Sequence, residues 1–186
     1  MKFKASFSFF IKSLLISFGM LVASNQANAE LKPGASAPDF TAPAALAGNT
    51  YSFALKEALK KGPVVVYFYP KAFTRGCTIE ATLFAEASDQ FKALNATVIG
   101  VSGDDIDTLK KFSTGPCGGK FAVAADLDRS IMKSYDAALT LMPTVADRIS
   151  YVVTPDFKIW FVHSGMNPDQ HVSETLKAIK AWKSKP

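Results

Sequence analysis

The sequence of 186 residues predicts an α/β fold in which helices cover both faces of a central sheet. The first observation is the run Val-Val-Val-Tyr-Phe-Tyr at residues 64–69, whose β-branched and aromatic residues are typical of a strand buried on both faces. The second is that apolar runs of strand length alternate with helical segments along the rest of the chain. This alternation is expected when helices pack on both sides of a sheet.

The first 29 residues are expected to be a secretory signal peptide, which leaves residues 30–186 as the folded domain. Residues 1–12 contain three lysines and no acid, and residues 13–23 form an apolar run that is short for a membrane span. Ala27-Asn28-Ala29 is an A-x-A cleavage site, so we expect a periplasmic or secreted mature chain without stable membrane association. The alternative is an uncleaved membrane anchor.

The composition of the mature chain narrows the possible functions. The formal net charge of +5 falls to +2 without the three lysines of the signal peptide, and no clustered basic patch indicates nucleic-acid binding. The chain contains two cysteines. A chain of this length can form a stable core without a disulfide bond. A redox role for the two cysteines is therefore favoured over a purely structural disulfide.

The amino-terminal part predicts an irregular segment followed by a hairpin and a short helix. Residues 31–40 contain Pro-Gly and Ala-Pro pairs and are expected to be irregular. Gly48-Asn49-Thr50 is expected to form the turn of a hairpin that continues into residues 51–53. A helix is predicted over residues 55–61, where Gly62-Pro63 ends it.

The central strand leads into a helix that carries the first cysteine. Pro70 ends the strand because it has no N–H to donate, and Cys77 follows a short loop at the predicted start of the helix. Apolar residues at helical spacing extend this helix to about residue 94: Ile79, Leu83, Ala87, Phe91 and Leu94. A thiol in a first helical turn faces unpaired N–H groups and the positive end of the dipole, which favour the reactive thiolate.

The remaining elements complete the alternating pattern. We expect strands at residues 96–102, 121–125, 149–153 and 159–162, and helices at 106–112, 131–135 and 168–182. Residues 113–119 read as a loop rich in Gly and Pro, and this loop contains Cys117.

The residues around the first cysteine resemble those of a known family. Pro70, Thr74 and Cys77 form Pro-x-x-x-Thr-x-x-Cys, the motif of the peroxiredoxins. The wider pattern Phe-Tyr-Pro-Lys-Ala-Phe-Thr-x-Gly-Cys-Thr-x-Glu resembles the peroxiredoxin Q branch, also called bacterioferritin comigratory proteins. The resemblance covers about residues 31–182 and implies a thioredoxin fold with an N-terminal extension.

The resemblance implies a thiol peroxidase that reduces hydrogen peroxide and organic hydroperoxides. Cys77 would be the peroxidatic nucleophile, Thr74 would hydrogen-bond the peroxide, and Pro70 would shield the thiolate. The segment around Arg148 matches the one that supplies a catalytic arginine, whose planar fork can pair with the thiolate and donate to the peroxide. The alternatives are a surface arginine and a buried, inert Cys77.

The resolving cysteine implied by the resemblance is Cys117. Many members place it five residues after the nucleophile, where this chain has Thr82, whereas a subgroup uses the end of the next helix. The cycle would pass through a sulfenic acid and a Cys77–Cys117 disulfide to reduction by a thioredoxin-like dithiol. A permanent structural disulfide is the alternative.

Other side chains give weaker indications. Arg75 replaces the Pro usual in this branch and could favour the thiolate or point into solvent. Glu80 is expected to interact with the helix dipole or anchor a loop. His163 and His171 form no recognisable metal set, and His171 is expected at the surface. We expect no cofactor, since no Gly-rich phosphate loop is present.

Two competing functions stay open at this point. An exported thioredoxin-fold thiol–disulfide reductase would need C-x-x-C, and Thr74 stands at the position of its first cysteine. A non-enzymatic binding module would instead contain an inert Cys77–Cys117 disulfide that stabilises the fold. If the protein is a peroxidase, its partners would be a peroxide substrate and a thioredoxin-like dithiol donor. We expect it to be a monomer or weak dimer.

Overall fold

The computed structural model describes residues 30–185. The predicted signal peptide therefore lies outside the described residues. Between residues 30 and 185, no helix has the length and apolar character needed to cross a membrane.

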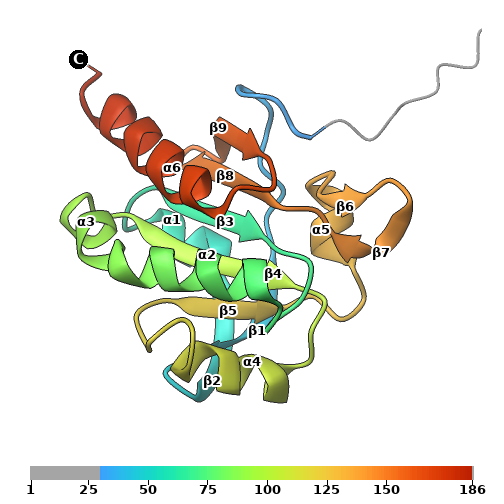
Figure 1. Ribbon diagram of the computed structural model, residues 1–186. Coiled ribbons are helices and arrows are strands. Elements are labelled where there is room, and N and C mark those ends of the chain that lie inside the picture. Colours follow the sequence, from blue (N-terminus) through green and yellow to red (C-terminus); the bar gives the residue numbers. More distant parts are fainter. Residues whose placement is uncertain (1–29, 186) are drawn as a thin grey trace, which may run out of the picture.

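A seven-stranded mixed sheet with helices on both faces confirms the predicted fold class (Figure 1). In the order β2-β1-β5-β4-β3-β8-β9, the three central strands β3, β4 and β5 are parallel, and the outer pairs are antiparallel. The strands of this sheet are β1 (Thr41–Leu46), β2 (Asn49–Ala54), β3 (Val64–Phe68), β4 (Thr97–Ser102), β5 (Ala122–Ala125), β8 (Ile149–Thr154) and β9 (Lys158–Ser164).

The helices divide into two layers. The helices are α1 (Leu55–Leu59), α2 (Arg75–Glu86), α3 (Ser88–Ala93), α4 (Ile106–Thr114), α5 (Ser130–Ser134) and α6 (Pro168–Lys183). Buried residues of α1 and α5 share one half of the core with one face of the sheet. Buried residues of α2, α3, α4 and α6 share the other half, and Figure 1 shows these helices on a common side.

The central strand β3 explains why the core has two halves. All five of its residues are buried, as the unbroken apolar run predicts. Because successive side chains of a strand point to opposite faces, Val66 and Phe68 belong to the α1/α5 half, and Val65 and Tyr67 belong to the half that contains α2. The loop that follows β3 therefore starts at the edge of the sheet where α2 begins.

The amino-terminal prediction needs one small correction. The β1–β2 hairpin turns at Ala47 and Gly48, both with positive φ, so the strand already begins at Asn49, inside the predicted turn. The preceding irregular segment is tied to β9, because Gly34 N–H donates to the carbonyl of Ile159 at 2.8 Å.

The long helix predicted over residues 77–94 is instead two helices, α2 and α3, separated at Ala87. The predicted apolar stripe is also displaced: Ile79 is 43% exposed, whereas Cys77, Glu80 and Phe84 are buried. Residues three and four apart lie on one helix face, so turning Cys77 inward also turns Glu80 inward. The helix consequently buries a carboxyl group.

A two-stranded sheet, β6 (Ala138–Leu139) with β7 (Met142–Ala146), has no counterpart in the prediction. Ala138 and Ala146 of this sheet are buried in the core, and the Arg129 guanidinium donates to the carbonyl of Thr144 at 2.9 Å. Only one of its strands is longer than two residues, and Met142 is exposed, so the pattern carries no strong strand signal.

Candidate active site

Cys77 lies in the first turn of α2, at the edge of the sheet where β3 ends. Thr74 is the N-cap residue of this helix, and Cys77 is 1% exposed. Thr74 makes no side-chain cap, so its hydroxyl does not occupy the N–H groups of the first turn. The sulfur therefore lies beside backbone donors that a bound oxygen can use.

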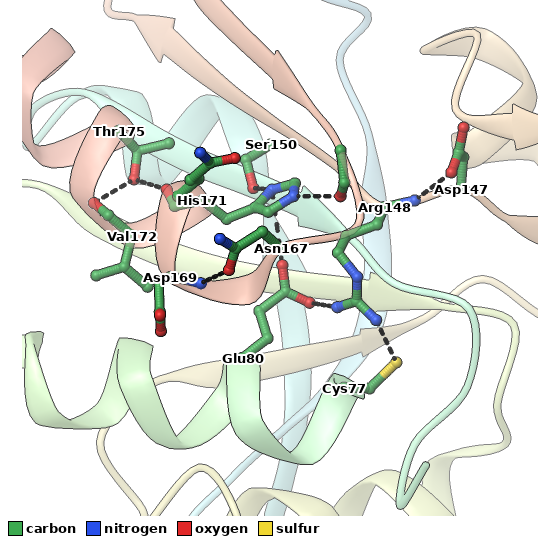
Figure 2. Close-up of polar contacts among 12 residues, drawn as sticks. Cys77, Glu80, Asp147, Arg148, Ser150, Asn167, Asp169, His171, Val172 and Thr175 are labelled. Atoms are coloured by element: carbon green, nitrogen blue, oxygen red, sulfur yellow. Dashed lines mark hydrogen bonds and ion pairs between the residues drawn. The ribbon is translucent and has the colours of Figure 1, made fainter. Parts of the chain in front are cut away.

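Arg148 reaches the cysteine from the residue before β8. Its Nη2 atom lies 3.4 Å from the Cys77 Sγ atom, and the side chain is buried (Figure 2). A Cβ atom on Gly76 would lie 2.9 Å from the same Nη2 atom. A glycine before the cysteine thus leaves the space through which the guanidinium approaches the sulfur.

The other edge of the guanidinium contacts Glu80. Arg148 Nη1 donates to Glu80 Oε2, and the two side chains are almost completely inaccessible to solvent. Burial raises the pKa of Glu80 to about 8, although the charge and hydrogen bond of Arg148 oppose this shift. One guanidinium therefore bridges a sulfur and a carboxyl group on the same helix.

The loop before the helix is fixed by an aspartate that sequence analysis did not identify. Asp104, just after β4, accepts hydrogen bonds from Ala72 N–H at 2.7 Å and from the Ser102 hydroxyl at 2.9 Å. In this loop Pro70 is half-buried, and the hydroxyl of Thr74 donates to the carbonyl of Lys71 at 2.9 Å. Asp104 thereby connects the end of β4 to the loop that carries Pro70 and Thr74.

His171 is completely buried, so the prediction of a surface position was wrong. Its Nδ1 atom lies 2.8 Å from the Ser150 hydroxyl and 3.7 Å from Glu80 Oε1, and its Nε2 atom lies 2.8 Å from the carbonyl oxygen of Gly165. The pKa of His171 is lowered to about 4, chiefly by burial and less by the nearby His163 and Arg148, although the hydrogen bond to Gly165 opposes this shift. Its partners come from α2, β8 and the β9–α6 connection, which sequence spacing does not bring together.

Cys117 is also a free, buried thiol, located in the loop after α4. It belongs to the same half of the core as Cys77, together with Tyr69 and Phe112, whose rings stack with centroids 5.6 Å apart. Burial raises the pKa of the Cys117 thiol. A thiol that stays protonated is a poor nucleophile, so Cys117 needs a more open environment to react.

The remaining side chains considered in the sequence analysis are Arg75 and His163. Arg75, at the first position of α2, is exposed. His163 contacts the His171 ring edge to face, with centroids 4.7 Å apart. Within residues 30–185, no group of three or more His, Cys, Asp or Glu side chains could hold a metal ion.

Sequence spacing contains a signal for part of what was missed. Glu80 follows Cys77 by three residues on a helix, and Ser150 follows Arg148 by two along a strand, so each lies on the face of the known site residue. Either signal can be used only if the side chain of the known site residue, Cys77 or Arg148, is already known to point into the protein. His171 and Asp104 carry no comparable signal, because the partners that connect them to the site, Ser150 and Ala72, are distant in sequence.

Comparison with known proteins places the chain in a family. The model of the AhpC/TSA family matches residues 33–162. Peroxiredoxin Q of the chloroplast of Oryza sativa subsp. japonica is 31% identical over 153 residues, which cover 82% of this chain and 68% of the relative. The corresponding protein of Sedum lineare is 33% identical over 125 residues and 67% of each chain.

Solved structures agree with the sequence comparison and confirm the predicted thioredoxin fold. Peroxidoxin BcpB from Mycobacterium tuberculosis superposes with a TM-score of 0.74 at 27% identity, covering 81% of this chain and 97% of that one. A cysteine-to-serine variant of Xylella fastidiosa PrxQ also gives 0.74, at 23% identity over 84% and 99% of the two chains, which shows the shared fold. The chain therefore belongs to the AhpC/TSA family and, within it, to the peroxiredoxins of the Q branch, which are peroxidase enzymes.

Proposed function

We propose that this peroxidase reduces hydrogen peroxide and organic hydroperoxides with Cys77 as the nucleophile. The observation that carries the proposal is the 3.4 Å contact between Arg148 Nη2 and the Cys77 sulfur. A permanent cation at this distance can pair with the thiolate that attacks the peroxide, and its remaining N–H groups can donate to an oxygen beside the sulfur. The contact lies in a buried site, where such electrostatic interactions are stronger than in water.

In the first step the Cys77 thiolate attacks one peroxide oxygen, and the O–O bond breaks heterolytically. The sulfur becomes a sulfenic acid, and the leaving oxygen departs as water or an alcohol after it takes up a proton. Negative charge develops on this oxygen, so catalysis needs donors directed at its position. Arg148 and the N–H groups of the first turn of α2 are suited to this role.

In the second step Cys117 would attack the sulfenic acid, forming a Cys77–Cys117 disulfide and releasing water. A thioredoxin-like dithiol would then reduce this disulfide and become oxidised itself. Both sulfurs are buried in the same half of the core, so α2 has to open locally before they meet. The uncapped start of α2 supports such opening, because a helix without a side-chain cap is less stable at that end.

Two alternative functions fit the structure less well than a peroxidase does. A thiol–disulfide reductase of this fold would use a second sulfur at the position of Thr74, which here is a hydroxyl bound to the Lys71 carbonyl. A binding module held by a permanent disulfide would need Cys77 and Cys117 to be bonded, whereas both are free in this structure.

We also propose that the enzyme acts outside the cytoplasm after removal of residues 1–29, which carry the export pattern. The plant relatives named above are chloroplast proteins, so location differs among related chains. We expect the intact mass of protein recovered from the exported fraction to match a chain that begins at Glu30. A mass that includes the first 29 residues would contradict cleavage and favour an anchor.

The peroxidase proposal is tested at Arg148. Arg148→Lys keeps a positive charge but loses the planar fork, so we expect oxidation of Cys77 by hydrogen peroxide to slow on the order of a hundredfold. Stopped-flow measurement of the single turnover gives the rate constant, and Cys77→Ser sets the background. Wild-type rates in the lysine variant, with an unchanged circular dichroism spectrum, would remove Arg148 from the peroxide step.

Thr74 offers a second test of how the peroxide is held. Its hydroxyl hydrogen is engaged by the Lys71 carbonyl, so its oxygen can accept a hydrogen bond from the peroxide O–H group. We expect Thr74→Val to slow Cys77 oxidation on the order of a hundredfold and Thr74→Ser to retain most of the rate. Equal rates in both variants would restrict Thr74 to shaping the loop.

Cys117→Ser tests the resolving step. The variant should still consume one equivalent of peroxide, while turnover with a dithiol protein falls sharply because no intramolecular disulfide can form. Mass spectrometry should detect Cys77 sulfinic acid at lower peroxide concentrations than in the wild type. Normal turnover by the variant would instead make the protein a one-cysteine peroxidase.

A further inference from the structure

Two buried acceptor atoms face each other behind the Arg148 contact (Figure 2). Glu80 Oε1 and His171 Nδ1 are 3.7 Å apart, and both side chains have no exposed surface. Within residues 30–185, Glu80 Oε1 is a buried oxygen with no hydrogen-bond partner. An unpartnered, buried carboxylate oxygen is costly, so this arrangement calls for one proton on the pair, held by either Glu80 or His171.

The surroundings of His171 fix where its own protons lie. The carbonyl oxygen of Gly165 can only accept, so the Nε2 atom 2.8 Å away must carry a hydrogen. The same Gly165 donates its N–H to the Arg148 carbonyl, which joins the ring to the base of the arginine. In a neutral ring, Nδ1 is then an acceptor with a single lone pair, which faces both the Ser150 hydroxyl at 2.8 Å and the Glu80 carboxyl group at 3.7 Å, so a proton from either group can occupy it.

We propose that Glu80 and His171 share one proton, and that this proton leaves the positive charge of Arg148 to the Cys77 sulfur. Glu80 and His171 are thus positioning residues that act through Arg148. The shared proton follows from the buried geometry alone. Its kinetic consequence rests on the proposed peroxidase function.

The charge balance of the buried cluster supports this assignment. The titratable groups around the pair are Cys77 on α2, Arg148 before β8, His163 on β9 and Tyr67 on β3. With Glu80 ionised and His171 neutral, Arg148 would face two anions, the carboxylate and the thiolate. With one proton on the pair, the guanidinium and thiolate balance each other, which avoids an uncompensated buried charge.

The pKa directions indicate which partner holds the proton at neutral pH. Burial raises the pKa of Glu80 to about 8, and burial, with smaller contributions from His163 and Arg148, lowers the pKa of His171 to about 4. The proton therefore resides on Glu80 and is lost above about pH 8. Once Glu80 is ionised, it competes with the sulfur and the peroxide for Arg148, so peroxide reduction should slow at alkaline pH.

Glu80→Gln is the decisive variant because an amide reproduces the protonated acid. Its carbonyl oxygen can accept from Arg148, and its NH₂ group faces His171 Nδ1 as the protonated oxygen of the acid does, but it cannot ionise. We expect this variant to keep the wild-type rate constant at neutral pH and to lose the alkaline decrease. Glu80→Ala should lose roughly tenfold to a hundredfold, because Arg148 is left without its carboxyl partner.

The experiment is a stopped-flow pH profile of Cys77 oxidation between about pH 6 and pH 10. Glu86→Gln is the matched control, since Glu86 lies on the same helix but is exposed, and it should behave as the wild type. A Glu80→Gln variant that folds but is as slow as Glu80→Ala would overturn the proposal, because an ionised Glu80 would then be required. An unchanged alkaline decrease in Glu80→Gln would overturn it equally.

A second pair of variants separates positioning from packing. His171→Asn places its amide near the Nδ1 position, next to Ser150 and Glu80, whereas His171→Gln reaches the Nε2 position and Gly165. We expect Gln to move the alkaline decrease to lower pH, because protonated Glu80 loses its acceptor, while Asn preserves the profile. Equal shifts in both variants would mean that His171 serves only to fill space.

A direct measurement of the proton needs neither a variant nor enzymatic activity. In ¹³C NMR of protein labelled at glutamate carboxyl groups, we expect one resonance to titrate near pH 8 and to be absent from Glu80→Gln. If every glutamate titrates in the ordinary range, the shared proton is excluded even in an active peroxidase. If peroxide reduction fails but the resonance titrates near pH 8, only the proposed function is wrong.

Discussion

The contact of one buried guanidinium with a sulfur and a carboxyl group is the constraint on which the site depends. The Arg148 side chain contacts Cys77 and Glu80, which both lie on α2. Its own backbone directly precedes β8. Burying such a charge is unfavourable unless its donors are satisfied. The first turns of α2 and the start of β8 therefore have to stay aligned for the fold and the chemistry alike.

The sheet provides this alignment through its central strands. β3 pairs with β4 on one side and with β8 on the other, so the loop before α2 and the arginine before β8 emerge at the same edge. The end of β4 adds Asp104, which holds the loop through Ala72. Three neighbouring strands thus each fix one part of the site: the nucleophile loop, its anchor and its cation.

The sequence was sufficient for the parts that depend on local pattern. The apolar run of β3, the proline that ends it and the helix that follows place Cys77 at a helix start, as the structure has it. The resemblance to peroxiredoxins predicts Arg148 as the catalytic arginine. Spacing alone could not distinguish it from a surface arginine.

The sequence was insufficient where a residue's environment comes from distant elements. The apolar spacing from Ile79 to Leu94 predicted one helix with Ile79 inside, yet the structure turns Cys77 and Glu80 inward and breaks the helix at Ala87. A histidine on an amphipathic helix looks like a surface residue unless its partners are known. His171 is buried because Ser150 and Gly165 satisfy its two nitrogens.

Both cysteines lie on one side of the sheet, and this placement divides the molecule into a moving and a fixed part. The aromatic and aliphatic residues packed around Cys77 and Cys117 belong to the half-core under α2, α4 and α6, whereas the half-core under α1 and α5 contains neither cysteine. A rearrangement that joins the sulfurs can therefore leave the second half-core packed. In amide hydrogen exchange, reduced and oxidised protein would differ mainly in α2 and the segment after α4, while α1 and the central strands would keep their protection and serve as the template on which the reduced site reassembles.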